Sequence, residues 1–413
     1  KIIEESKAAQ ETGPFEETEQ TNDNESVQEL LNALIVGQAF DTYILLQSGN
    51  NLYIIDQHAA HERIRYEIIK KRVERSIGDQ IRQWKSEEKI KGLYIDEDSK
   101  RYYPKGNLAA HIIGFVGEDN QGLDGIEKTM EKYLKGVPGK ILSEVDARGR
   151  QMPNYENKRI DPQDGLNVVL TIDETIQYFA EEALQKAIDD NKVANGAFAI
   201  VMDPRNGEIL AMVSKPDFNL NDPRACPPSQ DPSTWTGTSQ KDIDILYKTV
   251  WRNKAVSDTY EPGSTFKAIT TAIGFEEGVV TPESRTSDKT INVQGHNINC
   301  WKPNFHGEES FREAVYNSCN PAFVKVALDV GVDKYYSYLR AFGFYDKTGI
   351  ELPGEAKGSF HAKPKDIDLA VASFGQRFTV TPLEMIAAYG AIANGGKLIK
   401  PHLVKEIVDS EGN

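Results

Sequence analysis

The chain has 413 residues, of which 39 % are hydrophobic, and a formal net charge of −15. This length and composition predict a globular protein of two or three domains, and the acidic balance disfavours a surface that attracts nucleic acid by itself. No apolar run reaches the length of a membrane span and no signal peptide opens the chain, so we expect a fragment without anchor or export signal.

The first part of the chain changes from polar to alternating apolar residues. Residues 1–29 are rich in Glu and predict an acidic disordered linker. Residues 39–57 predict a strand, a turn and a second strand, and residues 58–73 have helical spacing. Residues 72–160 are charged and rich in turn residues, which predicts a small α+β domain.

The remaining chain, from about residue 161, has a stronger apolar periodicity. A strand over residues 167–170 enters a long amphipathic helix, whose apolar stripe is formed by Ile172, Ile176, Phe179, Ala183 and Ala187. Residues 197–214 predict a hairpin around Asp-Pro-Arg-Asn-Gly. Helical patterns then follow at 264–278, 310–317, 321–331, 333–344 and 381–396. This order predicts an α+β fold in which helices pack on an antiparallel sheet.

The stretch "YEPGSTFK" carries a candidate nucleophile. Ser264 follows a Pro-Gly break and opens an apolar helix, so Ser264 and Lys267 share one helix face. A serine hydroxyl needs an adjacent base, and a lysine can serve when burial keeps it neutral. The start of the helix also offers backbone N–H groups to a developing oxyanion.

Two further residues lie between predicted helices in "YNSCNP". The Ser318 hydroxyl and the Asn320 amide could pass a proton and hold a substrate amide. Neither Ser-x-x-Lys nor Ser-x-Asn is strong evidence for an active site alone, because each recurs elsewhere in a polar context, at Ser86–Lys89 and Ser48–Asn50.

Together, "AVSDTYEPGSTFK", "NSCNPAFV", "FYDKTGIELPGE" and "VASFGQRFTVTPLEMIAAYGAIANGG" resemble class B penicillin-binding proteins of the sporulation type. "EDSKRYYPKGNLAAHIIGFVG" resembles the pedestal that precedes their transpeptidase domain, so the resemblance covers about residues 72 to 413. The resemblance implies a penicillin-binding transpeptidase (serine β-lactamase-like) fold.

The same resemblance implies a function and roles for residues. Ser264 would be the acylated nucleophile, Lys267 its base, and Ser318 and Asn320 the second motif of a peptidoglycan D,D-transpeptidase. The implied substrates are stem peptides ending in D-Ala-D-Ala, with β-lactams as their mimics. The implied partners are the cell-wall machinery of division or sporulation, the location is the outer face of the cell membrane, and no cofactor is needed. A water acceptor would instead give a carboxypeptidase or β-lactamase.

The third motif of that family is Lys-Thr-Gly on an edge strand. The "KTG" that begins at Lys347 lies in a Gly/Pro-rich connector, so we do not assign it to the site. We expect the true motif beyond Asn413, and therefore an impaired activity for this chain.

The stretch "DQHAAHERIRYE" raises a different chemistry. His58, His61 and Glu62 lie at helical spacing on one face, where such residues bind divalent ions, although a solvated face is the alternative. The stretch resembles the C-terminal domain of the MutL mismatch-repair family, which implies a Zn or Mn site at Asp56, His58 and Glu62. Nucleic acid would be a partner only if this part functions.

These resemblances divide the chain into an acidic linker (1–29), a MutL-like fragment (30–70), a partial pedestal (72–160) and a truncated transpeptidase domain (161–413). We interpret the junction near residue 71 as the seam of a chimera. The alternatives are a MutL-like endonuclease or dimerisation module and an inactive fusion fragment.

Cysteines and the remaining histidines suggest little chemistry. The three cysteines are too few for a disulfide framework and predict free thiols, with a Cys226–Cys300 bridge as the alternative. His296 and His306 flank Cys300, but without a paired Cys-x-x-Cys a packed loop is favoured over a metal site.

Overall fold

The computed structural model describes residues 34–39, 43–48, 51–56, 75–88, 99–117, 119–142, 158–303 and 306–412. The chain forms two compact units, residues 1–99 and 100–413.

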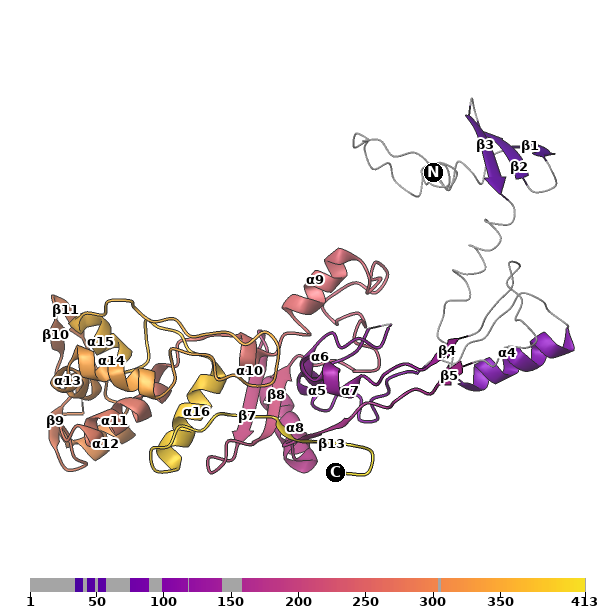
Figure 1. The fold of residues 1–413 in the computed structure, drawn as a ribbon. Helices are drawn as coiled ribbons and strands as arrows, with labels where there is room; N and C mark the ends of the chain where they lie inside the picture. The colour runs from indigo at the N-terminus through magenta and orange to yellow at the C-terminus, as the bar shows by residue number, and fades with distance from the viewer. Residues whose placement is uncertain are drawn as a thin grey trace, which may run out of the picture. The chain divides into compact units, whose positions relative to one another are not determined.

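The first unit contains an antiparallel sheet of three strands in the order β1-β2-β3 and a helix (Figure 1). The bounds are β1 (Leu34–Ala39), β2 (Tyr43–Ser48), β3 (Asn51–Asp56) and α4 (Arg75–Glu87). The sequence predicted β2 and β3 and missed β1. The helix predicted at 58–73 lies outside the described residues.

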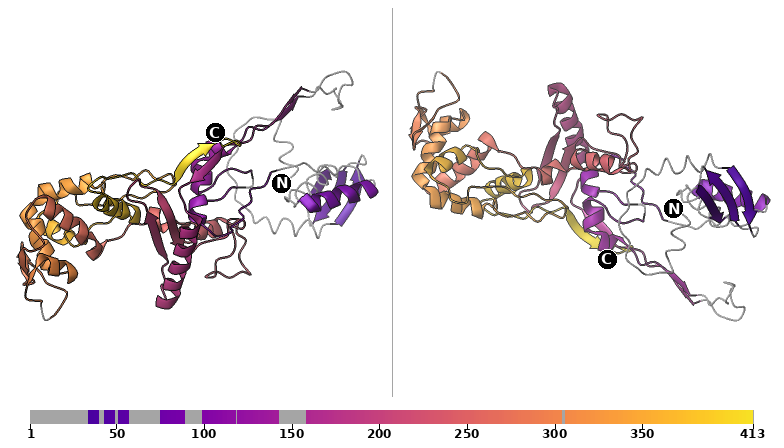
Figure 2. Two further views of the ribbon diagram at one scale, coloured as in Figure 1. Left: turned by 90° about the horizontal axis from the view of Figure 1, so that it is seen from below. Right: turned by 90° about the horizontal axis from the view of Figure 1, so that it is seen from above.

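The second unit begins with short helices and a narrow hairpin. The elements are α5 (Ala110–Ile113), α6 (Gly125–Thr129), α7 (Glu131–Leu134), β4 (Lys140–Leu142) and β5 (Lys158–Ile160). β4 and β5 pair antiparallel, and Figure 2 shows this hairpin extending away from the helices. Phe115 and Phe218 share an apolar cluster, which joins this region to the chain after β8 (Ile209–Lys215).

The next layer is the predicted hairpin with its helix. β7 (Ala197–Met202) pairs antiparallel with β8 (Ile209–Lys215), and α8 (Glu174–Asn191) packs on both strands. β6 (Asn167–Leu170) pairs with β13 (Val404–Val408), which brings the end of the described chain back to this layer (Figure 1).

The apolar stripe predicted for α8 is wrong in part. Phe179 is 65 % exposed, whereas Gln177 is fully buried. The Gln177 side chain accepts a hydrogen bond from the Met212 N–H (2.8 Å) and donates one to the Met212 carbonyl (3.1 Å). The amide thus satisfies the backbone of β8, and this pairing turns the polar side chain inward.

The rest of the chain is mainly helical, and the largest apolar cluster among the described residues lies within it; Phe266, Tyr335 and Phe344 are fully buried members of this cluster. Figure 1 shows α11 to α15 gathered together in this region. The predicted helices are confirmed, within a few residues at their ends. The elements are α9 (Gln240–Lys248), α10 (Lys254–Ser257), η2 (Gly263–Phe266), α11 (Lys267–Glu276), β9 (Arg285–Ser287), β10 (Ile291–Val293), β11 (His296–Ile298), β12 (Glu308–Ser310), α12 (Phe311–Tyr316), α13 (Asn320–Val330), α14 (Val332–Ala341), α15 (Asp366–Ala372) and α16 (Pro382–Ala393).

The fold is α+β, as predicted, and its antiparallel pairing occurs in sheets of two or three strands rather than in one broad sheet. Cys226, Cys300 and Cys319 are free thiols, so the alternative disulfide does not form in this structure. Within the described part of the chain, no helix combines the length and the apolarity needed to cross a bilayer.

Candidate active site

Ser264 lies at the entry of α11, but not in the α-helix itself. Residues 263–266 form a 3₁₀ turn, and the α-helix begins at Lys267. Side chains three residues apart eclipse one another in a 3₁₀ turn, so Ser264 and Lys267 still point to the same side. Phe266 is fully buried between the rings of Phe344 and Phe378, which fixes the turn to the core.

Lys267 is buried, with 5 % of its surface exposed, and its ammonium has three acceptors. Nζ donates to the Ser318 carbonyl at 2.8 Å, to Ser318 Oγ at 2.9 Å and to Asn320 Oδ1 at 2.7 Å. Burial lowers the pKa of Lys267 from 10.5 to about 8, while the nearby thiols of Cys319 and Cys300 oppose this shift. The lysine can therefore exchange its proton close to neutral pH.

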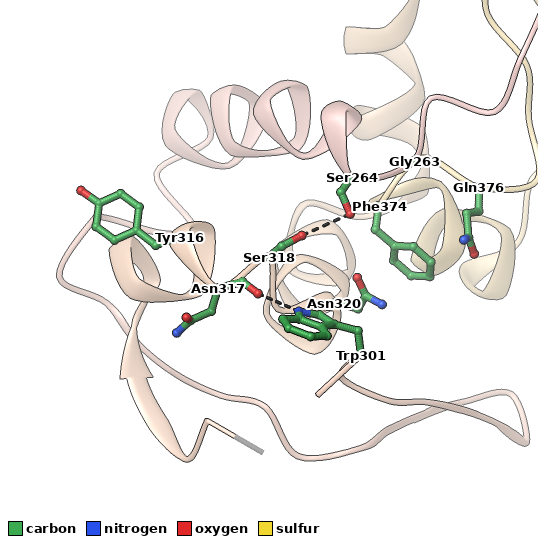
Figure 3. Close-up of a pocket in the computed structure, with 9 residues that line it drawn as sticks. All are labelled: Gly263, Ser264, Trp301, Tyr316, Asn317, Ser318, Asn320, Phe374 and Gln376. Atoms are coloured by element: carbon green, nitrogen blue, oxygen red, sulfur yellow. Dashed lines mark hydrogen bonds between the residues drawn. The ribbon is translucent and has the colours of Figure 1, made fainter. Parts of the chain in front are cut away.

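Ser318 lies between the lysine and the nucleophile. Its Oγ is 3.1 Å from Ser264 Oγ (Figure 3), while no hydrogen bond joins Lys267 Nζ directly to Ser264 among the described residues. Ser318 has a left-handed backbone with φ +53°, an uncommon conformation for a residue with a side chain. Such strained residues gather at functional sites, where the surrounding packing holds them.

Asn320 is the first residue of α13 and lies two residues after Ser318. Its Oδ1 is committed to Lys267, so its amide Nδ2 remains as a donor at the cavity. The four residues singled out from the sequence, Ser264, Lys267, Ser318 and Asn320, thus meet at one place. Their catalytic roles remain a prediction.

Ser264, Ser318 and Asn320 line a cavity of about 450 Å³ (Figure 3). Its lining includes residues that the sequence analysis did not assign to the site: Gly263, Trp301, Tyr316, Asn317, Phe374 and Gln376. Trp301 is 64 % exposed, and its indole N–H donates to the Asn317 carbonyl at 2.8 Å. Trp301 had no signal in the sequence, because its contact with Asn317 joins residues 16 positions apart.

The far wall of the cavity depends on a close backbone approach. The Gly263 N–H donates to the Gly375 carbonyl at 2.8 Å. A Cβ on Gly375 would lie 2.1 Å from the Gly263 carbonyl oxygen, so only glycine fits there. This contact places Phe374 and Gln376 opposite Ser318.

Lys347 lies in a loop outside this cavity, as the sequence predicted. The backbone N–H of Thr348 and that of Gly349 both donate to the Glu355 carboxylate, so the Lys-Thr-Gly stretch closes its own turn.

The metal-ligand patterns gain no support from the structure. Asp56 ends β3, while His58 and Glu62 lie outside the described residues, so the proposed Zn or Mn site is untested. Among the residues that are described, no group of three or more His, Cys, Asp or Glu side chains could hold a metal ion. His296, His306 and Cys300 are among these residues and form no such group.

Comparison with known proteins identifies two domains in this chain. Residues 197–413 match the penicillin binding protein transpeptidase domain, and residues 14–170 match the penicillin-binding protein dimerisation domain. The chain is 40 % identical over 324 residues to stage V sporulation protein D of Bacillus subtilis strain 168, covering 78 % of this chain and 47 % of that protein.

Two further similarities extend over the same region. The chain is 31 % identical over 310 residues to peptidoglycan D,D-transpeptidase FtsI of Escherichia coli K12, covering 75 % of this chain and 48 % of that protein. The crystal structure of penicillin binding protein 3 from Mycobacterium tuberculosis, complexed with aztreonam, superposes with a TM-score of 0.62 at 27 % identity, covering 76 % of this chain and 63 % of that chain. The chain spans about half the length of these curated relatives.

The MutL interpretation of residues 30–70 receives no support from these comparisons, and neither does a seam near residue 71. The dimerisation-domain match runs through that stretch and assigns it to a penicillin-binding protein. A short polar pattern with metal-ligand spacing specifies a site only when further ligands complete it, and the described residues offer no such set. The chain belongs to the class B penicillin-binding proteins, with a dimerisation domain followed by a penicillin-binding transpeptidase domain.

Proposed function

We propose that this protein is a peptidoglycan D,D-transpeptidase that forms an acyl-enzyme on Ser264. The observation that carries the proposal is the hydrogen-bonded path from Lys267 Nζ through Ser318 Oγ to Ser264 Oγ, with steps of 2.9 and 3.1 Å. This path connects a buried amine to an exposed hydroxyl at the edge of a cavity, which is the arrangement that nucleophilic catalysis requires.

Lys267 keeps its hydrogen-bond partners in both protonation states, but only the neutral amine can accept a proton. A charged lysine donates to all three of its acceptors. A neutral lysine donates to the Ser318 carbonyl and to Asn320 Oδ1, and its lone pair accepts from the Ser318 hydroxyl. In the structure the Ser318 hydroxyl donates to Ser264 Oγ at 3.1 Å, and once this hydrogen bond reverses, the proton of the nucleophile can pass through Ser318 to Lys267.

Acylation follows from this arrangement. As Ser264 Oγ bonds to the carbonyl carbon of the penultimate D-Ala, its proton passes through Ser318 to Lys267. The bond to the terminal D-Ala breaks, and the same path returns the proton to the leaving amine. The Ser264 backbone N–H, in the first turn before α11, lacks an intrahelical partner and is suited to the oxyanion.

The amide of Asn320 and the indole of Trp301 are suited to bind the peptide. Nδ2 of Asn320 can donate to a substrate carbonyl, and the exposed ring of Trp301 offers an apolar surface. A β-lactam presents the same acyl group to Ser264, and a relative of known structure binds aztreonam. We extend this binding to the present chain.

The similarity to stage V sporulation protein D favours a role in cell-wall synthesis during sporulation. Stem peptides lie outside the cytoplasm, so the proposed site of action is the outer face of the cell membrane, together with the cell-wall synthesis machinery. The domains proposed from the sequence, a pedestal over 72–160 and a transpeptidase domain over 161–413, fit this role.

The test is covalent labelling with a fluorescent penicillin. Labelling should require Ser264 and disappear in Ser264→Ala. The matched control is Ser86→Ala, which alters an exposed serine of the other Ser-x-x-Lys on α4 and should label normally. Labelling of Ser264→Ala at the wild-type rate would refute the assignment of the nucleophile.

A further inference from the structure

A second cavity, of about 430 Å³, is lined by Glu261, Ser359, Phe360, His361, Arg377, Phe378 and Thr379. We propose that it binds the acceptor of the transfer reaction, and that it selects an amine whose carbon also bears a carboxylate. This inference rests on the proposed transpeptidase function and deepens it by naming the acceptor class.

The second cavity adjoins the nucleophile through two short segments. Glu261 lies three residues before Ser264, and Arg377 directly follows Gln376, which lines the first cavity. The Gly263–Gly375 hydrogen bond clamps these segments together. The two cavities therefore share the same pair of neighbouring segments, one of which carries Ser264.

The walls of this cavity are extended segments that pair with one another. Tyr260 and Val380 exchange two backbone hydrogen bonds, of 2.9 and 3.0 Å. Ser359 and Thr379 exchange two more, of 2.8 and 3.0 Å. Paired backbones hold the lining side chains in place before any ligand arrives, which lowers the entropic cost of binding.

Arg377 has an unusual backbone and an unused side chain. Its φ is +64°, in the left-handed region that disfavours residues with a Cβ. Glu261 holds this conformation, since its Oε1 accepts the Arg377 N–H at 3.0 Å. The Arg377 guanidinium makes no hydrogen bond or ion pair with any residue that the structure describes.

Glu261 and Arg377 thus present opposite charges to one cavity without pairing with each other. Beyond the Arg377 N–H, the Glu261 carboxylate has no partner among the described residues. A ligand that carries both an ammonium and a carboxylate would satisfy both side chains, the carboxylate through the bidentate guanidinium geometry. The hydroxyls of Ser359 and Thr379 are neutral and can hydrogen-bond to either the ammonium or the carboxylate of the ligand.

The transfer step balances for such an acceptor. The bound ammonium first gives one proton to solvent, and the amine nitrogen then bonds to the ester carbon of the acyl-enzyme. The bond from that carbon to Ser264 Oγ breaks, and a second amine proton passes to Ser264 Oγ. The products are an amide and the free serine.

The experiment compares two acceptors that differ only in the carboxylate, glycine and methylamine, at equal concentrations of neutral amine. The protein is acylated with a thioester donor that ends in D-Ala, and the partition of the acyl-enzyme between amide and hydrolysis products is measured. The ratio of amide to hydrolysis product depends only on acyl-enzyme that has already formed, so a change in the acylation rate does not alter this ratio.

The wild-type protein should prefer glycine over methylamine, and Arg377→Gln should reduce this preference by about tenfold or more, the scale of a charge-assisted pair. Arg377→Gly should do the same while relieving the left-handed strain, so a folding defect is not the cause. Arg312→Gln, which alters an exposed arginine paired with Glu283, is the matched control and should retain the preference.

An unchanged preference in both Arg377 variants would overturn the acceptor site, and so would equal use of the two amines by the wild-type protein. Failure of the wild-type protein to release thiol from the donor would instead overturn the proposed function. The two failures are therefore distinguished in one assay.

Discussion

The protonation state of Lys267 should control the rate of acylation. Burial lowers the pKa of Lys267 to about 8, and the proposed path needs the neutral amine to accept the proton of Ser264. Raising the pH increases the neutral fraction, so the rate of penicillin acylation should rise with pH and level off above pH 8.

The size of this rise follows from the pKa. With a value of about 8, about 9 % of Lys267 is neutral at pH 7, about 50 % at pH 8 and about 90 % at pH 9. The second-order rate constant should therefore increase about fivefold from pH 7 to pH 8 and less than twofold from pH 8 to pH 9. A lysine with its ordinary value of 10.5 would give nearly a tenfold rise at each step.

Stopped-flow labelling with a fluorescent penicillin gives this profile, with the spontaneous hydrolysis of the β-lactam subtracted at each pH. Lys325→Ala, which alters an exposed lysine of α13 paired with Asp329, should leave the profile unchanged. Lys267→Arg should abolish acylation at every pH, because a guanidinium does not deprotonate in this range. A wild-type rate that is flat between pH 7 and pH 9 would contradict the role of Lys267 as the base.

Three further substitutions test other parts of the structure. In Gly375→Ala the new Cβ would lie 2.1 Å from the Gly263 carbonyl oxygen, so penicillin labelling should slow by about 10²-fold. In Gly263→Ala the new Cβ meets no atom within 4 Å, so the expected effect is a loss of roughly 1–2 kcal/mol of stability, caused by the φ of +59°. Gln177→Leu leaves a buried backbone pair unsatisfied and should lower the free energy of unfolding in urea by about 1–3 kcal/mol, while Gln185→Leu on the exposed face of the same helix should change it by less than about 0.5 kcal/mol. Lys347→Ala should label with penicillin as the wild-type protein does, and a loss of labelling in a folded variant would mean that its loop belongs to the site.

Local patterns in the sequence predicted most of the elements but not their contacts. The helices from residue 264 onward follow the 3.6-residue periodicity of buried side chains, a signal that lies within each segment. The inward position of Gln177 could not be predicted, because its partner Met212 is 35 residues away and belongs to another element. A buried polar side chain is specified by that partner, and periodicity records only apolarity.

In the candidate site, too, local sequence patterns predicted the residues that local geometry brings together but not those that long-range contacts bring together. Ser264 and Lys267 are three residues apart, so local geometry alone brings them to one side. Ser318 lies 54 residues from Ser264: its own loop made it a candidate, but only the resemblance to a family placed it in the same site as Ser264. Arg377 had no signal in the sequence, since neither its left-handed backbone nor its contact with Glu261 is a local property.

The reactivity of Lys267 therefore depends on the packing around Ser318 as much as on its own burial. Ser318 supplies two of the three acceptors of the ammonium, its carbonyl and its hydroxyl, while held at a φ of +53°. That conformation costs on the order of 1–3 kcal/mol and persists only where neighbours enforce it. The neighbours are the fully buried Ala314 and Cys319, whose backbones are joined by a 3.0 Å hydrogen bond across the turn. A change that relaxes this buried turn would release both acceptors at once, so the core between α12 and α13 determines whether the lysine and the nucleophile remain connected.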